Sequence, residues 1–92
     1  MNETIEIVHD PDEALLAERG VRDWPIWEKE VSRFPWTYDS AEVCYLLEGE
    51  VVVTPEGGEP VHIRAGDLVR FPAGMSCQWE IRQPVRKHYS FE

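Results

Sequence analysis

Cysteine, basic residues and long apolar runs are all scarce in this 92-residue sequence. Two cysteines do not make the disulfide framework of a small secreted domain, so we expect two free thiols. Nine basic against 18 acidic residues give a formal net charge of −9, which argues against nucleic acid and anionic membranes as partners because both bind basic surfaces. No apolar run approaches the roughly 20 residues of a membrane-spanning helix. The acidic N-terminus has no apolar signal segment, which predicts a cytoplasmic protein.

The residues that are present are typical of one folded domain. Hydrophobic residues make up 42% of the chain and aromatic residues 11%, and four residues are tryptophan. This composition belongs to globular rather than disordered proteins. A chain of this size buries roughly 60–65% of its unfolded surface, which is enough for one core and not for two. We therefore expect a single domain over residues 1–92.

The first 23 residues predict a short strand and one short helix. Polar and apolar residues alternate over residues 3–8, as they do in a strand. Asp10 can cap a helix, Pro11 suits its first position and Gly20 suits its end. The helix should therefore lie between Asp10 and Gly20.

Glycines and prolines divide residues 24–91 into short segments that alternate as strands do. We expect strands over residues 26–31, 34–38, 42–48, 50–54, 61–63, 68–71, 76–82 and 85–91. The pair Gly57-Gly58 between two glutamates is typical of a hairpin loop. Short strands at this regular spacing predict an all-β sandwich or barrel over residues 24–91.

Alternation within two of these strands indicates which side chains face the interior. Cys77 and Trp79 are apolar whereas the residues on either side of Trp79 are polar, so both are expected to point inward. Trp36 and Tyr38 share the bulky aromatic face of their strand and are expected to point inward as well. If Glu42 also points inward, it joins these four residues and Cys44.

The direction of Glu42 is left open by the sequence. Glu42 and Cys44 share one face of their strand and Val43 lies on the other, and both faces are apolar enough to be core. If Glu42 points inward, its charge is costly to bury unless it is paired. Lys87 lies on the apolar face of the last strand and is a candidate partner, although such a lysine more often reaches the solvent. His88 has the opposite parity, so only one of the two can face the interior.

Two motifs in this region have the spacing of a known family. Residues 42–49 read Glu-Val-Cys-Tyr-Leu-Leu-Glu-Gly, and residues 66–77 read Gly-Asp-Leu-Val-Arg-Phe-Pro-Ala-Gly-Met-Ser-Cys. With residues 24–28 and 84–89, these motifs resemble the small single-domain cupins related to ureidoglycine aminohydrolase, and the chain is also similar to the ethanolamine-utilisation cupin. The resemblance implies a jelly-roll β-barrel, here with one short N-terminal helix. Stand-alone members of this kind mostly have no assigned function.

The resemblance also implies where a metal would bind and shows that ligands for it are missing. Glu42 matches the glutamate that ligates metal in metal-binding cupins, and Cys77 stands in the position of a histidine. Trp36 and Tyr38 replace the usual His-x-His pair, and neither is an ordinary ligand of a divalent metal. One carboxylate and one thiolate are fewer than the three or four ligands of a stable site. We expect no cofactor, or a weak site for Zn, Mn, Fe or Ni on Glu42 and Cys77.

An enzyme is the first function that these residues suggest. Glu42 would act as general acid or base, Tyr38 as proton donor and Cys77 as nucleophile or ligand on a small polar metabolite. Cys77 has no evident base beside it, and a buried cysteine is more often a small apolar core residue. The resemblance makes a reaction like that of ureidoglycine aminohydrolase one version of this hypothesis.

A metal-free binding or sensing module and an accessory subunit without catalysis are the alternatives. A binding module would hold its ligand between Trp36 and Trp79, near Cys44 and Lys87. An accessory subunit would fill its interior with side chains, as small barrels often do. A cavity of about 300 Å³ or more beside Glu42 would distinguish a ligand site from a filled core.

The segment around Trp24 and Trp27 predicts a homodimer. Apolar side chains exposed on so small a domain mark surfaces that a partner covers, and the resemblance points the same way because cupins often pair through N-terminal strands. The alternative is that both tryptophans pack within the monomer, across the open side of the barrel.

Overall fold

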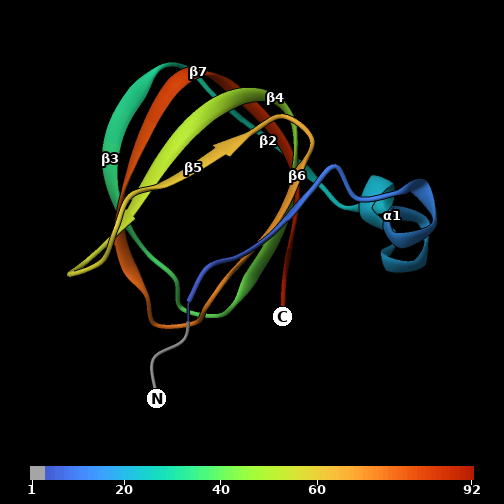
Figure 1. Cartoon of the computed structure of the whole chain (residues 1–92), viewed down its shortest axis with the longest axis horizontal. Helices are drawn as coiled ribbons and strands as arrows, with labels where there is room; N and C mark the ends of the chain where they lie inside the picture. Colours follow the sequence, from blue (N-terminus) through green and yellow to red (C-terminus); the bar gives the residue numbers. More distant parts are fainter. Residues whose placement is uncertain (1–3) are drawn as a thin grey trace.

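The computed structural model describes residues 4–92, and strands dominate this part of the chain. In chain order the elements are β1 (Glu6–His9), α1 (Glu13–Arg19), a 3-10 turn (Val21–Asp23), β2 (Ile26–Lys29), β3 (Ser32–Thr37), β4 (Glu42–Pro55), β5 (Val61–Arg64), β6 (Asp67–Phe71) and β7 (Ser76–Phe91). Figure 1 shows the strands curling around an interior, with α1 outside on the right. No helix among the described residues is long and apolar enough to cross a membrane.

All seven strands belong to one sheet with the order β1-β6-β4-β7-β2, to which β3 is added through β7 and β5 through β4. Each pair of neighbours is antiparallel. No pairing joins β1 to β2 at the two ends of this order in the described part of the chain. The prediction of an all-β domain with one short helix is confirmed, whereas the sheet does not close into the barrel that the resemblance implied.

The two long strands, β4 and β7, bend halfway and change neighbours at the bend. β4 pairs first with β6 and then with β5, while β7 pairs first with β3 and then with β2. Gly49 lies at the bend with a φ of 107°, and a Cβ there would lie 2.5 Å from the carbonyl oxygen of Pro84. The predicted breaks at Gly49 and before Val85 are wrong as strand ends, because β4 and β7 stay paired on both sides of them.

The N-terminal segment follows the prediction with two corrections. Asp12 rather than Asp10 caps α1, and its carboxylate accepts a hydrogen bond from the backbone N–H of Leu15 at 2.9 Å. Asp10 has a φ of 47° and donates its backbone N–H to the carbonyl oxygen of Gly66, so it belongs to a turn before the helix. Gly20 ends α1 in the left-handed conformation, as predicted. The strand predicted over residues 3–8 is β1, and residue 3 lies outside the described residues.

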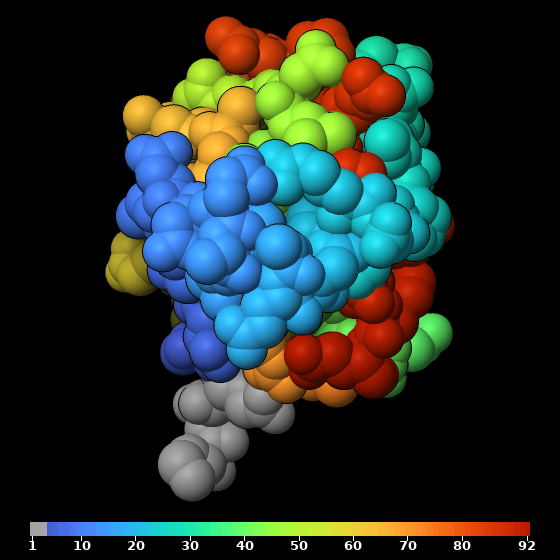
Figure 2. Space-filling model, turned by 90° about the vertical axis from the view of Figure 1, so that its right-hand side faces the viewer, coloured from blue at the N-terminus to red at the C-terminus, as the bar shows by residue number. Residues whose placement is uncertain are grey.

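α1 and the 3-10 turn cover the outer face of the sheet, and Figure 2 views the molecule from this side. Leu16 and Val21 are buried there against Val43 of β4 and Leu68 of β6. Val43 therefore faces the helix, which leaves the opposite face of β4 for the interior. Glu42 lies on that inner face and is 4% exposed, so the direction that the sequence left open is inward.

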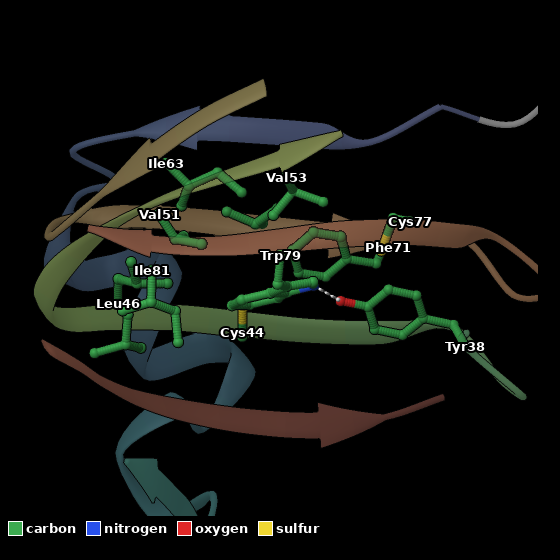
Figure 3. Packing of buried hydrophobic residues seen from close by; sticks show 12 residues of the cluster. Tyr38, Cys44, Leu46, Val51, Val53, Ile63, Phe71, Cys77, Trp79 and Ile81 are labelled. Atoms are coloured by element: carbon green, nitrogen blue, oxygen red, sulfur yellow. Dashed lines mark hydrogen bonds between the residues drawn. The ribbon is translucent and has the colours of Figure 1, made fainter. Parts of the chain in front are cut away.

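The inner face of the sheet encloses the main core, which Figure 3 shows from close by. Cys77 and Trp79 are buried as predicted, and so is Tyr38. Trp36 points to the same side, where its ring contacts that of Tyr38, but it is not buried, because 48% of it remains exposed. The buried members of this core are Tyr38, Cys44, Leu46, Val51, Val53, Ile63, Val69, Phe71, Cys77, Trp79, Ile81 and Val85.

Candidate functional site

A pocket of about 180 Å³ opens on the inner side of the sheet. Seven of its nine lining residues are aromatic, and the other two are Glu42 and Lys87. The full lining consists of Trp27, Phe34, Trp36, Tyr38, Glu42, Trp79, Lys87, Tyr89 and Phe91. Trp36 and Phe91, which are 48% and 57% exposed, form part of its rim. Glu42 lines the pocket as expected of a ligand site, but the volume falls short of the roughly 300 Å³ set for such a site. The space that side chains leave open could hold only a small molecule.

A buried ion pair lies in this pocket. The Nζ atom of Lys87 donates a hydrogen bond of 2.7 Å to Oε2 of Glu42, and the two side chains are 7% and 5% exposed. The candidate partnership of Glu42 and Lys87 is thus confirmed. His88 points to the opposite face of β7 as its parity requires. It is buried there, and its Nδ1 atom lies 2.9 Å from the carbonyl oxygen of Trp24.

Two tryptophan rings stand beside the ammonium group of Lys87. Its Nζ atom is 4.9 Å from the ring centroid of Trp27 and 4.7 Å from that of Trp79. The faces of both rings carry negative potential and attract a cation, all the more where water is excluded. Burying two charges costs several kcal/mol each unless close partners offset the loss of water. In this pocket Glu42 and the two rings supply that compensation.

One oxygen of Glu42 remains available to a ligand. Oε2 is bonded to Lys87, but Oε1 has no hydrogen-bond partner among residues 4–92. No fully buried side-chain nitrogen or oxygen in this part of the chain lacks a partner. Oε1 is therefore not fully enclosed, and since Glu42 lines the pocket, this oxygen faces it as a hydrogen-bond acceptor.

Tyr38 lines the same pocket and carries a hydroxyl group. Its hydroxyl oxygen accepts a hydrogen bond of 3.2 Å from Nε1 of Trp79, drawn as the dashed line in Figure 3. Its own proton has no acceptor among the described residues. Burial, reinforced by the nearby charge of Glu42, raises the pKa of Tyr38 well above its usual value. Tyr38 therefore keeps its proton at neutral pH and is a hydrogen-bond donor rather than a phenolate.

Neither cysteine lines this pocket, although both thiols lie close enough to affect the pKa of Tyr38. Cys77 is not among the residues that line the pocket of Glu42; it borders a shallow hollow beside Thr37 and Pro55. Its thiol is 3.5 Å from the carbonyl oxygen of Trp36, and burial raises its pKa to about 11. Cys44 is a fully buried free thiol, and burial raises its pKa to about 12. Both thiols are protonated at neutral pH, which makes them weak nucleophiles and weak metal ligands.

The residues at the metal position of the cupin pattern do not fit a divalent cation. Glu42 is already bonded to an ammonium group, and a cation bound to the same carboxylate would meet the charge of Lys87 at close range. Tyr38 and Cys77 hold their protons. Within residues 4–92, no cluster of three or more His, Cys, Asp or Glu side chains is arranged to hold a metal ion.

The structure adds four pocket residues that the sequence did not single out as site residues. Tyr89 lies two positions after Lys87 on the same face of β7, and this parity could have identified it. Trp27 is paired with Lys87 in the register of β2 and β7, and no local pattern in the sequence shows which strands are neighbours. Phe34 and Phe91 complete the lining from β3 and β7.

Comparison with known proteins gives the chain its family. A family model described as the EutQ-like cupin domain matches residues 16–89. The crystal structure of a DUF861 family protein from Thermotoga maritima is 50% identical and superposes with a TM-score of 0.93, covering 97% of this chain and 100% of that one. The EutQ protein of Clostridium difficile is 25% identical with a TM-score of 0.63, covering 70% of this chain and 50% of that one.

A curated relative is much longer than the region that matches. Acetate kinase EutQ from Salmonella typhimurium is 39% identical over 56 residues, which are 61% of this chain and 24% of the relative. The aligned region thus spans about a quarter of that protein. The family model matches most of the present chain, as does the Thermotoga structure, which is of similar length. This chain belongs to the EutQ-like cupin domain family.

Proposed function

We propose that this cupin binds a small uncharged metabolite in its aromatic pocket and does so without a metal. The observation that carries the proposal is the buried pair of Glu42 and Lys87, which lines a pocket walled by seven aromatic side chains. The pair is neutral as a unit, so the pocket offers no unbalanced charge to attract an ion. Aromatic walls with a few placed polar groups are typical of small-molecule sites.

The polar groups of the pocket indicate which ligands it would prefer. Oε1 of Glu42 accepts a hydrogen bond and the hydroxyl of Tyr38 donates one. A carboxamide or ureido group carries both an N–H and a carbonyl oxygen and so can use both partners. A pocket of about 180 Å³ limits the ligand to a small molecule. The resemblance to ureidoglycine aminohydrolase cupins points to the same class of compound, and membership of that subgroup, like the jelly-roll arrangement, stays a prediction.

Catalysis on such a ligand is the second candidate. The observation in its favour is the free oxygen of Glu42, which faces the pocket and could accept a proton from water. Cys77 contributes less than the sequence suggested, because it lies outside the pocket and holds its proton. The enzyme hypothesis therefore depends on Glu42 and Tyr38. Incubation with methylurea or propionamide and measurement of released ammonia tests it directly.

Calorimetric titration with propionamide tests binding, with methyl acetate as a compound of similar size that has no N–H. Propionamide should bind and methyl acetate should bind more weakly, because hydrogen bonds to charged groups contribute about 1.5–3 kcal/mol. Trp36→Ala should weaken binding by removing part of the rim, while Val31→Ala, at an exposed apolar residue that is not among the lining residues, should not. Equal heats for both compounds, or equal effects of both variants, would contradict the proposal.

Metal content and assembly are tested separately. Elemental mass spectrometry of untagged protein should find no stoichiometric Zn, Mn, Fe or Ni, and a metal that is lost in Glu42→Gln would overturn the metal-free site.

Trp24 packs on the outer cluster and Trp27 on the main core, as in the intramolecular alternative to a homodimer. Val8 and Ile26 are exposed apolar residues on β1 and β2. The homodimer remains a proposal, which light scattering coupled to size-exclusion chromatography can test.

A further inference from the structure

We infer that Lys87 forms a reversible imine with a small aldehyde or ketone held in the pocket. The inference rests on the proposed ligand pocket and adds a covalent step to it. The structure places three features together: a buried primary amine, a carboxylate in direct contact with it, and an aromatic cavity that both residues line. Lysines that form imines with carbonyl compounds are characteristically desolvated in apolar pockets.

Glu42 is the group that removes the proton from Lys87. An ammonium group has no lone pair, so Lys87 becomes nucleophilic only after it loses a proton. Oε2 of Glu42 lies 2.7 Å from Nζ and already accepts a hydrogen bond from it. Transfer of that proton leaves a neutral amine beside a neutral carboxylic acid. The same contact that stabilises the ion pair therefore provides a route to the free amine.

The reaction balances without any further reactant. After Lys87 gives one proton to Glu42, its lone pair forms a bond to the carbonyl carbon and the carbonyl π bond breaks. A second proton moves from nitrogen to the former carbonyl oxygen and gives a carbinolamine. Glu42 then returns its proton to the hydroxyl group, the carbon–oxygen bond breaks and water leaves. The nitrogen lone pair closes the C=N bond, which yields an iminium ion beside the carboxylate.

The surroundings of Lys87 favour this product. The iminium ion carries the same positive charge as the ammonium that it replaces, and Glu42 and the rings of Trp27 and Trp79 are already arranged around that charge. The small volume of the pocket selects a short carbonyl compound. An uncharged compound fits best because the charges of Glu42 and Lys87 already balance each other.

The sequence supplies an internal control, because Lys29 is the one other lysine in the chain. Lys29 lies on β2, and its Nζ atom is 5.4 Å from the ring centroid of Phe34. Both lysines thus contact an aromatic ring. Among the described residues Lys29 has no carboxylate within salt-bridge distance, whereas Lys87 is paired with Glu42. A difference in reactivity between the two lysines therefore reports on the carboxylate and the pocket rather than on the aromatic contact.

Reductive trapping tests the inference on the intact protein. The protein is incubated with propionaldehyde and sodium cyanoborohydride, digested with a glutamate-specific protease and mapped by mass spectrometry. We expect the propyl adduct on Lys87 to form about 10-fold faster than on Lys29 or the N-terminal amine, a small part of the gain that orientation can supply. Lys87→Arg keeps a cation beside Glu42 and should lose this adduct, while Lys29→Arg should leave the adduct on Lys87 unchanged.

Propionamide separates the inference from the function on which it rests, because it resembles the aldehyde in size but does not form an imine. If propionamide binds and slows trapping at Lys87, both the pocket and the imine are supported. If propionamide binds but Lys87 is labelled no faster than Lys29, the imine is refuted and the binding function stands. If neither compound engages the pocket, both are refuted.

Discussion

Neutralising Glu42 should destabilise the protein far more than neutralising a surface glutamate. Glu42→Gln keeps the size of the side chain but leaves the ammonium of Lys87 buried without its counter-charge. Breaking a buried ion pair by removing one partner costs about 3–5 kcal/mol. Because the amide oxygen of glutamine can still accept a hydrogen bond from Lys87, we expect about 3 kcal/mol for this variant. A domain of this size typically has only about 5–15 kcal/mol of stability in total.

Lys87→Met and the double variant complete the test. Lys87→Met leaves the carboxylate buried with no donor and should cost about 3–5 kcal/mol. Glu42→Gln combined with Lys87→Met buries no charge, so it should be clearly more stable than the sum of the single effects implies. The difference, obtained from a double-mutant cycle, should be about 2–3 kcal/mol. Such a value would show that the main cost is the unpaired charge and not the lost packing.

The assay is urea unfolding followed by tryptophan fluorescence, with thermal unfolding as a second measure. A loss of about 3 kcal/mol corresponds to a fall of about 12–24 °C in melting temperature for a domain of this length. Glu13→Gln is the matched control, because Glu13 is 2.8 Å from Arg22 in an ion pair whose side chains are 76% and 54% exposed. This control should lose less than about 1 kcal/mol. If Glu42→Gln and Glu13→Gln cost the same, water reaches the inner pair and the reasoning fails.

Three further predictions concern the thiols, the bend and metal removal. Because burial raises the pKa of the fully enclosed Cys44 thiol to about 12 from an ordinary 9.0, stability should be complete below pH 9 and fall by about 1.4 kcal/mol per pH unit between pH 9 and 12. The pKa of Cys77 is raised to about 11, and this less enclosed thiol should add a smaller fall. Cys44→Ala should reduce that slope in urea titrations, and an unchanged slope would argue against the cause. Gly49→Ala should lower the free energy of unfolding by about 2–3 kcal/mol more than Gly74→Ala. Both glycines have positive φ, but only Gly49 is close to another backbone segment. Similar losses for the two variants would show that the bend relaxes. Dialysis against EDTA should leave the melting temperature unchanged, and a fall would reveal a structural metal.

The sequence predicts the strands well because alternation and turn residues are local signals. The inward direction of Trp79 and the end of α1 at Gly20 both follow from such signals. The cap at Asp12 was missed because two aspartates precede the helix and the choice between them depends on a turn that contacts Gly66. Local patterns give the elements but not the contacts between segments that are distant in the chain.

The site was predictable in part for the same reason. The cupin-like motif singled out Glu42, and the alternation of β7 singled out Lys87 as its candidate partner. Which face of β4 turns inward, however, depends on the helix that covers Val43. Trp27 joins the pocket through its pairing with Lys87, which only the folded sheet defines. Cys77 shares the interior face of β7 with Trp79 but lies outside the pocket, because inward direction alone does not say which part of the interior a side chain reaches.

The pairing of β4 with β7 also bears on how fast the protein folds. The ion pair that this sheet brings together joins residues 45 positions apart, so a long loop must close before its contacts can form, with a loss of chain entropy. Domains dominated by such distant contacts fold in about milliseconds to seconds, whereas helical bundles need microseconds to milliseconds. We expect slow folding, through a transition state in which β4 and β7 are already paired. A fragment that lacks β7 would then have no binding site, because Lys87 and three of the aromatic lining residues lie on β7.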